Sequence, residues 1–132
     1  MSGVVHPDPV GIVHCAATLF SPDHSRSETV DLLVDTGSTL TWIPEELAAE
    51  LGVRPMGIAE FQTGDGTTIH RPIGEVYLEI AGRRQTVPIA FARPEDARVL
   101  GVTAMEALTL EVNPTTRTLR ATGKYLYLRL AA

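Results

Sequence analysis

One carboxylate, that of Asp35, follows an apolar run and precedes small hydrogen-bonding residues. The run is Leu32–Val34, and the residues that follow are Thr36, Gly37 and Ser38. A positioned carboxylate can take a proton from water as a general base or give one as a general acid. Two carboxylates about 3 Å apart share one proton, because both cannot stay ionised, and together they supply the base and the acid. A single motif of this kind raises the question of where a second carboxylate would come from.

The neighbours of Asp35 suit a loop that is held in one conformation. Gly37 allows a tight turn and lets its backbone N–H approach the carboxylate without a side chain in the way. Thr36 and Ser38 add hydroxyl groups that can orient the loop. A Ser38 hydroxyl bonded to the carboxylate would favour its ionised form, which predicts an acidic pH optimum. The competing interpretation is an ordinary turn, since aspartate and glycine are both common turn residues.

Strand-like segments surround this motif. Strands are predicted over residues 10–20, 29–34 and 39–43, which are rich in β-branched and apolar residues. A short helix is predicted from Pro44 to Gly52, because proline suits the first helical position and glycine can end a helix. The central part of the chain favours two β-hairpins, one turning at Asp65-Gly66 and one near Gly82.

The last quarter of the chain favours a short helix followed by further strands. The helix is predicted over Thr103–Leu108, and two strands are predicted around an Asn113-Pro114 turn. The segment 124–130 alternates, so that Leu126, Leu128 and Leu130 share one face. This apolar face is of the kind that a core needs, and it favours a strand that closes the chain's own barrel over one that extends an interface.

Composition and charge exclude several classes of function. The length of 132 residues predicts a single domain over residues 1–132, with residues 1–9 as a flexible N-terminal segment. The net charge of −5 and the lack of a Lys/Arg cluster argue against a nucleic-acid partner. The N-terminus does not read as a signal peptide, and no apolar run approaches the ~18 residues that span a membrane. We therefore expect a cytoplasmic protein that makes no membrane contact.

Metal and thiol chemistry find no support in the sequence. The four histidines have no metal-ligand spacing, and the single cysteine, Cys15, reads as a small core residue and not as a nucleophile. No glycine-rich phosphate-binding pattern occurs. We expect no metal and no cofactor.

The order of the motifs resembles the single-lobed, retropepsin-like aspartic proteases of prokaryotes. Asp35–Gly37 is followed by a glycine-bearing hairpin and then by Val99–Gly101 and a short helix. In that family a hydrophobic-hydrophobic-glycine motif packs against the loop that bears the aspartate. The resemblance covers residues 28–122, and the ordered set of elements favours a site over an incidental turn.

The resemblance implies a mainly β fold, namely a retropepsin-like acid-protease barrel with a flap hairpin and one or two short helices. It implies an aspartic endopeptidase that acts on a peptide or protein substrate. The site residues that it implies are the catalytic Asp35, the loop-supporting Thr36, Gly37 and Ser38, and the flap residues Gly64, Asp65 and Gly66. Because the chain carries one Asp-Thr-Gly, the dyad requires Asp35 from two subunits, and a two-fold homodimer is expected.

Two alternatives stay open at the level of the sequence. The first is a non-catalytic module that keeps the retropepsin fold for dimerisation or peptide binding, with Asp35 idle. The second is a structural β-barrel domain in which the Asp-Thr-Gly is incidental. Peptide hydrolysis that a statine-type inhibitor blocks would favour the enzyme, whereas peptide binding without cleavage would favour the module.

Overall fold

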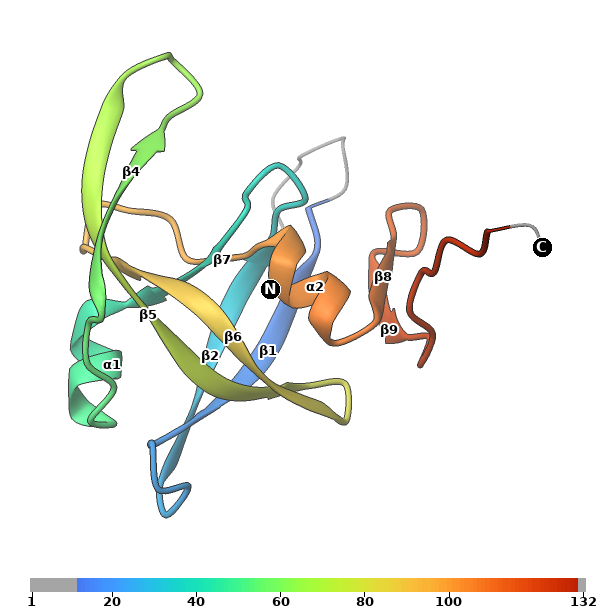
Figure 1. Cartoon of the computed structure of the whole chain (residues 1–132), viewed down its shortest axis with the longest axis horizontal. Helices are drawn as coiled ribbons and strands as arrows, with labels where there is room; N and C mark the ends of the chain where they lie inside the picture. The colour runs from blue at the N-terminus through green and yellow to red at the C-terminus, as the bar shows by residue number, and fades with distance from the viewer. Residues whose placement is uncertain (1–11, 131–132) are drawn as a thin grey trace.

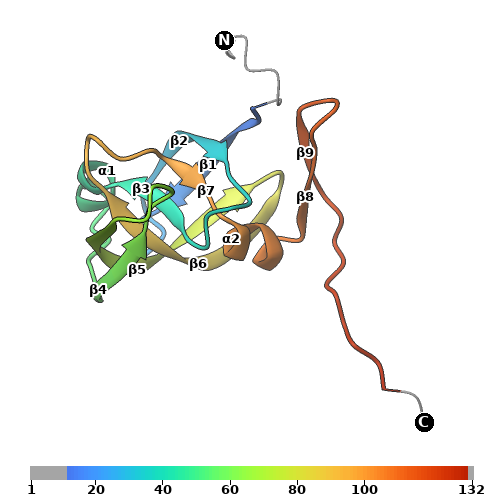
Figure 2. The same ribbon diagram turned by 90° about the horizontal axis from the view of Figure 1, so that it is seen from above.

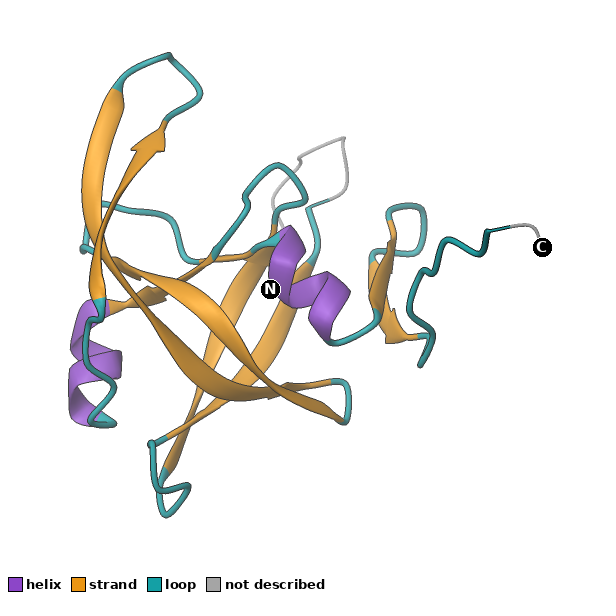
Figure 3. Ribbon diagram, in the orientation of Figure 1, coloured by secondary structure: helices purple, strands orange, loops and turns teal. Residues whose placement is uncertain are grey.

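Strands are the main regular element of the computed structural model, which describes residues 12–130 (Figure 1). The predicted flexible segment 1–9 lies outside the described residues. The elements in chain order are β1 (His14–Phe20), β2 (Ser27–Val34), β3 (Thr41–Pro44), α1 (Glu45–Glu50), β4 (Gly57–Gln62), β5 (Thr68–Ile80), β6 (Arg83–Ala92), β7 (Val99–Leu100), α2 (Val102–Ala107), β8 (Leu110–Asn113) and β9 (Thr118–Ala121). The predicted mainly β architecture with two short helices is confirmed (Figure 3).

One curled sheet forms the body of the molecule. Its strand order is β3-β6-β5-β1-β2-β7, and β4 pairs with the outer half of the long strand β5. The two end strands, β3 and β7, contact each other, so the sheet curls back on itself in the manner of a barrel. Two parallel pairs, β3 with β6 and β2 with β7, bring segments that are far apart in sequence side by side.

Local sequence accounts for the hairpins. Strands β5 and β6 are joined by Ala81 and Gly82, which both have positive φ, 52° and 77°. Two-residue turns of this type match the twist of the strands that they join. The β4–β5 hairpin turns at Gly66, whose φ is 89°, and it extends beyond the body of the sheet (Figure 1). Both hairpins were predicted from their turn residues.

The core lies inside the curl of the sheet. Alternate residues of the strands are fully buried, among them Leu19, Leu32, Leu78 and Ile89. Helix α2 adds Ala104 and Met105 to the same cluster. Residues that alternate in this way place one face of each strand in the core and the other in solvent.

The C-terminal segment contradicts one prediction. Strands β8 and β9 form a separate two-stranded sheet whose inner residues pack on the core. Residues 122–130 form no strand, and the side chains of Leu126, Leu128 and Leu130 are 82–101% exposed. The prediction that this tail closes the chain's own barrel is wrong, because β8–β9 already cover that part of the core. Figure 2 shows the tail running away from the body.

Candidate active site

Asp35 is the first residue after β2, and distant backbone groups fix its position. Its N–H donates to the carbonyl of Leu100 at 3.0 Å, which continues the parallel pairing of β2 with β7. The N–H of Ser38 donates to the Asp35 carbonyl at 3.1 Å and closes a turn. The carboxylate therefore sits at the end of a strand that is paired on both sides, with β1 and with β7.

Helix α2 and the glycine that precedes it hold the other half of the loop. The first N–H groups of the helix, those of Val102 and Thr103, donate to the carbonyls of Ser38 and Thr39 at 2.8 and 3.1 Å. Such N–H groups have no partner inside a helix, so they are available to a neighbouring loop. The predicted packing of the Val99–Gly101 motif against the Asp35 loop is confirmed.

Gly101 leaves no room for a side chain. A Cβ at this position would lie 2.3 Å from the carbonyl oxygen of Leu40, which is far below van der Waals contact. The Gly101 N–H donates to the buried hydroxyl of Thr41 at 3.0 Å. The backbone of residues 38–41 and the backbone of residue 101 are thus packed directly against each other.

The Asp35 carboxylate is exposed and accepts one hydrogen bond within the described chain. Its Oδ1 accepts from the N–H of Gly37 at 2.9 Å. The Ser38 hydroxyl donates to the carbonyl of Leu40 at 2.7 Å and not to the carboxylate, so the prediction of a Ser38–Asp35 bond is wrong. The Ser38 hydroxyl instead fixes the segment that leads from the Asp35 loop into β3. Thr36, between Asp35 and Gly37, is exposed.

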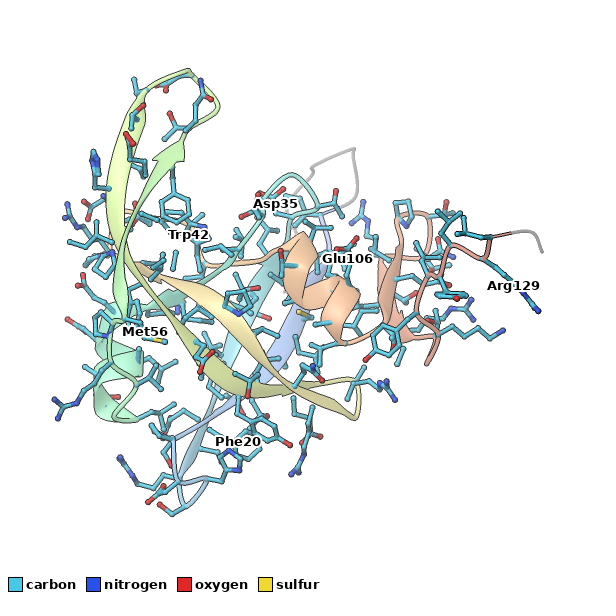
Figure 4. The ribbon with its side chains drawn as sticks, in the orientation of Figure 1. Phe20, Asp35, Trp42, Met56, Glu106 and Arg129 are labelled. Atoms are coloured by element: carbon cyan, nitrogen blue, oxygen red, sulfur yellow. The ribbon has the colours of Figure 1, made fainter. Side chains whose placement is uncertain are left out.

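The Asp35 loop faces a cleft of about 880 Å³. The opposite wall is the β4–β5 hairpin, which contributes Phe61 and Ile69, and a third wall is the segment 96–99. Trp42 of β3 and Phe61 meet edge to face, with ring centroids 4.8 Å apart, and join the base of the cleft to the hairpin. Asp35 and Trp42 are labelled in Figure 4. A largely apolar cleft with a few polar groups is the usual form of a binding site.

The tip of the hairpin is organised by its own side chains. Asp65 accepts hydrogen bonds from the Thr67 N–H at 3.0 Å, from the Thr67 hydroxyl at 2.8 Å and from the Thr63 hydroxyl. These bonds, with that from Thr63 foremost, lower the pKa of Asp65 to about 2. Of the three predicted flap residues, Gly64 lines the cleft, whereas Asp65 and Gly66 lie in the turn outside it.

A buried ion pair beside the cleft was not predicted from the sequence. Arg71, at the base of the hairpin in β5, donates to both carboxylate oxygens of Asp96 at 2.7 and 2.9 Å. Asp96 also accepts from the N–H of Arg93 at 2.9 Å. The hydrogen bonds from Arg71 hold the pKa of Asp96 below its usual value. Because Asp96 belongs to the β6–β7 loop, the pair joins the hairpin to the wall of the cleft.

The positions of the ligand and thiol groups in residues 12–130 give little support to metal binding or thiol chemistry. No three His, Cys, Asp or Glu side chains there come together as metal ligands. Burial, with a smaller effect from the Asp31 charge, raises the pKa of the Cys15 thiol to about 12, so a reactive thiolate does not form near neutral pH. No helix in this part of the chain is long and apolar enough to cross a membrane.

Comparison with known proteins agrees with this geometry. A family model described as "Aspartyl protease" matches residues 25–121, which include the Asp35 loop, the hairpin and Gly101. The chain belongs to the aspartyl protease family that this model describes. No curated protein matches the chain.

The solved structures that resemble this chain include two of viral proteins. The structure of the foamy viral protease-reverse transcriptase in complex with RNA/DNA hybrid matches with a TM-score of 0.52 and 18% identity, over 77% of this chain. The chain spans only 13% of the length of that protein, and the match supports the fold. The solution structure of the Simian Foamy Virus (mac) protease matches with a TM-score of 0.49 and 17% identity, over 70% of this chain and 90% of that one.

Proposed function

We propose that this aspartyl protease family member is an endopeptidase whose catalytic dyad consists of Asp35 from two subunits. The observation that carries the proposal is which of the carboxylates around the cleft have side-chain partners. Asp96 is bound to Arg71, and Glu60 lies on the hairpin, 3.7 Å from the ring of His70. Within the described residues, the Asp35 carboxylate accepts one hydrogen bond, from the N–H of Gly37 in its own loop. One such carboxylate per chain makes half of a dyad, and a two-fold axis beside the loop supplies the other half.

The proposed reaction is the addition of water to a peptide carbonyl. The ionised Asp35 takes a proton from the water while the water oxygen bonds to the carbonyl carbon. The protonated Asp35 of the other subunit gives its proton to the carbonyl oxygen. The tetrahedral intermediate then breaks its C–N bond. The leaving nitrogen takes the proton that the first Asp35 received from the water. The second Asp35 takes a proton from a hydroxyl of the diol, so the dyad again holds one proton. Thr36, Gly37 and Ser38 keep the carboxylate in position.

The β4–β5 hairpin is the proposed flap, with Gly64–Gly66 at its tip. In the described chain β4 pairs only with β5, so its outer edge is free to bond an extended peptide. The hydrogen bonds at the tip are all made within the tip, which leaves the tip free to move while the Arg71–Asp96 pair holds the base of the hairpin. Flap closure over a bound peptide would exclude water from the cleft.

The proposal is tested by Asp35→Asn, with Asp31→Asn in β2, the strand that leads to Asp35, as a control. Asp31 is exposed and lines no cleft wall. Cleavage of an extended-peptide library is followed by mass spectrometry from pH 3 to pH 8. We expect Asp35→Asn to lose hydrolysis while its fold and sedimentation stay unchanged, and Asp31→Asn to retain it. Full turnover by Asp35→Asn would remove Asp35 from the mechanism, and peptide binding without cleavage by the wild type would support the non-catalytic module.

A further inference from the structure

Two cross-strand pairs make up the cleft-facing side of the β4–β5 hairpin. Phe61 lies opposite Ile69, and one step nearer the barrel Ala59 lies opposite Arg71. Residues opposite each other share a face of a hairpin, as do residues two apart on one strand. The first three of these residues line the cleft. The buried side chain of Arg71 therefore lies on the same side, at the foot of this wall.

The hairpin leaves the barrel directly after this point. Residues 73–80 of β5 pair with β6, whereas residues 68–72 pair only with β4 in the part of the chain that the structure describes. A two-stranded hairpin is marginally stable by itself. Contacts at its base therefore decide where the hairpin stands relative to the rest of the cleft.

The wall formed by residues 96–99 is fixed at both ends. At one end the N–H of Leu33 donates to the Arg98 carbonyl at 3.0 Å, where β7 joins the sheet. At the other end Asp96 closes a turn, because its carboxylate accepts the Arg93 N–H at 2.9 Å. Within residues 12–130, the bonds from Arg71 to Asp96 are the only hydrogen bonds between the 93–98 loop and the hairpin.

The geometry of this ion pair suits it to hold a distance. The side chains of Arg71 and Asp96 are 8% and 12% exposed, and two parallel bonds join them. A two-pronged bond between a guanidinium and a carboxylate fixes direction as well as separation. The guanidinium is also oriented on its own strand, because it donates to the His70 carbonyl at 2.9 Å. The pair therefore behaves as a rigid strut between two walls of the cleft.

We propose that the Arg71–Asp96 strut sets the spacing between the hairpin and the 96–99 wall, and that this spacing selects substrates by the size of one apolar side chain. That side chain enters between the Phe61–Ile69 pair and Val99, which line the same cleft. Arg71 is a positioning residue, since it acts through Asp96 and does not itself line the cleft. The proposal rests on the proposed function, because it concerns a peptide in the same cleft.

The test replaces the strut by apolar residues, Arg71→Met together with Asp96→Leu. Replacement of both partners of a buried ion pair often leaves stability unchanged, whereas removal of one partner does not. The double variant therefore separates the spacing of the walls from the stability of the fold. The Arg93 N–H that loses its acceptor is exposed, so water can replace the carboxylate. The control is Arg84→Met with Glu79→Leu, a more exposed ion pair outside the cleft.

Peptide binding is measured in the Asp35→Asn background, so that the readout needs no hydrolysis. The probes are extended octapeptides whose fourth residue is Ala, Val, Leu or Phe, and the fluorescence of Trp42, the single tryptophan, reports binding in the cleft. We expect the Asp35→Asn chain and the control to bind the best peptide at least ~10-fold more tightly than the worst. We expect the double variant to reduce that ratio to about 2-fold. If the double variant does not fold, Arg71→Lys, which keeps the charge but loses the two-pronged bond, should reduce the ratio as well.

The outcomes distinguish this proposal from the proposed function. A folded double variant that keeps the size ratio of the Asp35→Asn chain overturns the strut, and so does an Asp35→Asn chain that binds all four peptides equally or binds none. Size selection that the double variant loses, in a wild type that hydrolyses none of the peptides, overturns the proposed function and leaves the strut standing. Hydrolysis by the wild type and the double variant with the same ratios of kcat/KM overturns the strut alone.

Discussion

Asp35 and Asp65 make the same local contact but lie in different surroundings. Each carboxylate accepts a hydrogen bond from the backbone N–H two residues further on, that of Gly37 in one case and that of Thr67 in the other. Such contacts are common in turns. The local contact therefore does not distinguish a site from a turn.

The two regions differ in where their other contacts come from. The Asp35 loop is bonded to residues more than 60 positions away, through Leu100 and the start of α2. The Asp65 turn is bonded only within residues 63–67. A loop held from a distance keeps its carboxylate in one place, whereas a turn held by itself moves with its hairpin. Long-range backbone contacts therefore distinguish the Asp35 loop, where we propose the site, from the Asp65 turn.

The largest effect is expected from Gly101→Ala, which attacks the long-range contact directly. The new methyl group would lie 2.3 Å from the Leu40 carbonyl, so the loop that bears Asp35 must shift. Displacement of a reacting group by about 1 Å can cost on the order of 100-fold in rate, and we expect a loss of peptide hydrolysis at least that large. The overpacking should also lower the free energy of unfolding by about 3 kcal/mol.

Gly57→Ala is the control for this substitution. A Cβ at Gly57 meets its nearest atom at 3.9 Å, which is ordinary contact. Urea denaturation of both variants, alongside peptide hydrolysis, checks the expectation. If Gly101→Ala retained wild-type kcat/KM, the close packing behind the loop would be irrelevant to the site.

The next largest effect is expected from Arg71→Met, which separates the hairpin from the cleft wall. Both side chains of the Arg71–Asp96 pair are about 10% exposed, and removal of one partner of a buried pair costs about 3 kcal/mol. That corresponds to a fall in Tm of roughly 10 °C. Arg84→Met, which breaks an exposed pair with Glu79, should have a much smaller effect.

The same pair predicts how this loss depends on pH. Because Arg71 holds the pKa of Asp96 below its usual value, the stabilisation is fully present above the ordinary carboxyl pKa near 3.9. It is lost as the pH falls through the lower pKa of the folded state. Thermal melting of the wild type and Arg71→Met should therefore differ most above pH 5 and converge below about pH 4. A difference that stays constant down to pH 2 would contradict this account.

A smaller effect is expected from Thr41→Val, a substitution that keeps the volume of the side chain. It removes the hydroxyl that accepts the Gly101 N–H in a fully buried position. An unsatisfied buried donor lowers the free energy of unfolding by about 2 kcal/mol. We expect kcat to fall more than KM changes, because the substitution affects the position of the loop that bears Asp35 and not the affinity for the peptide. Thr29→Val, on the exposed side of β2, is the matched control. Equal stabilities of the two variants in urea would argue against the bond.

The smallest effect is expected from Asp65→Ala at the tip of the hairpin. The carboxylate is exposed and its partners are all within the turn. We expect Tm to stay unchanged and kcat/KM to fall modestly, because only the order of the proposed flap is affected. Thermal melting with steady-state kinetics checks this, and a loss of activity as complete as that of Gly101→Ala would remove the contrast between the two regions.

Contiguous patterns in the sequence predicted much of this structure. The Asp-Thr-Gly loop, the Asp65-Gly66 turn and the helix after Gly101 are each readable from adjacent residues. The Arg71–Asp96 pair joins residues 25 positions apart, and the Thr41–Gly101 bond joins residues 60 positions apart. No local pattern in the sequence predicts either contact. The alternation of Leu126, Leu128 and Leu130 predicted a strand that the structure does not form, because periodicity carries no information about what a segment packs against.

The state of Cys15 has a practical consequence for measuring motion in this protein. A thiol with a pKa of about 12 is almost entirely protonated at neutral pH, and maleimide and methanethiosulfonate reagents react with the thiolate. The native cysteine is therefore nearly silent towards these labels. A cysteine introduced at Asp65 or Leu128 would be the one readily labelled position, so spin-label distances could follow the hairpin tips or the tails in the natural background.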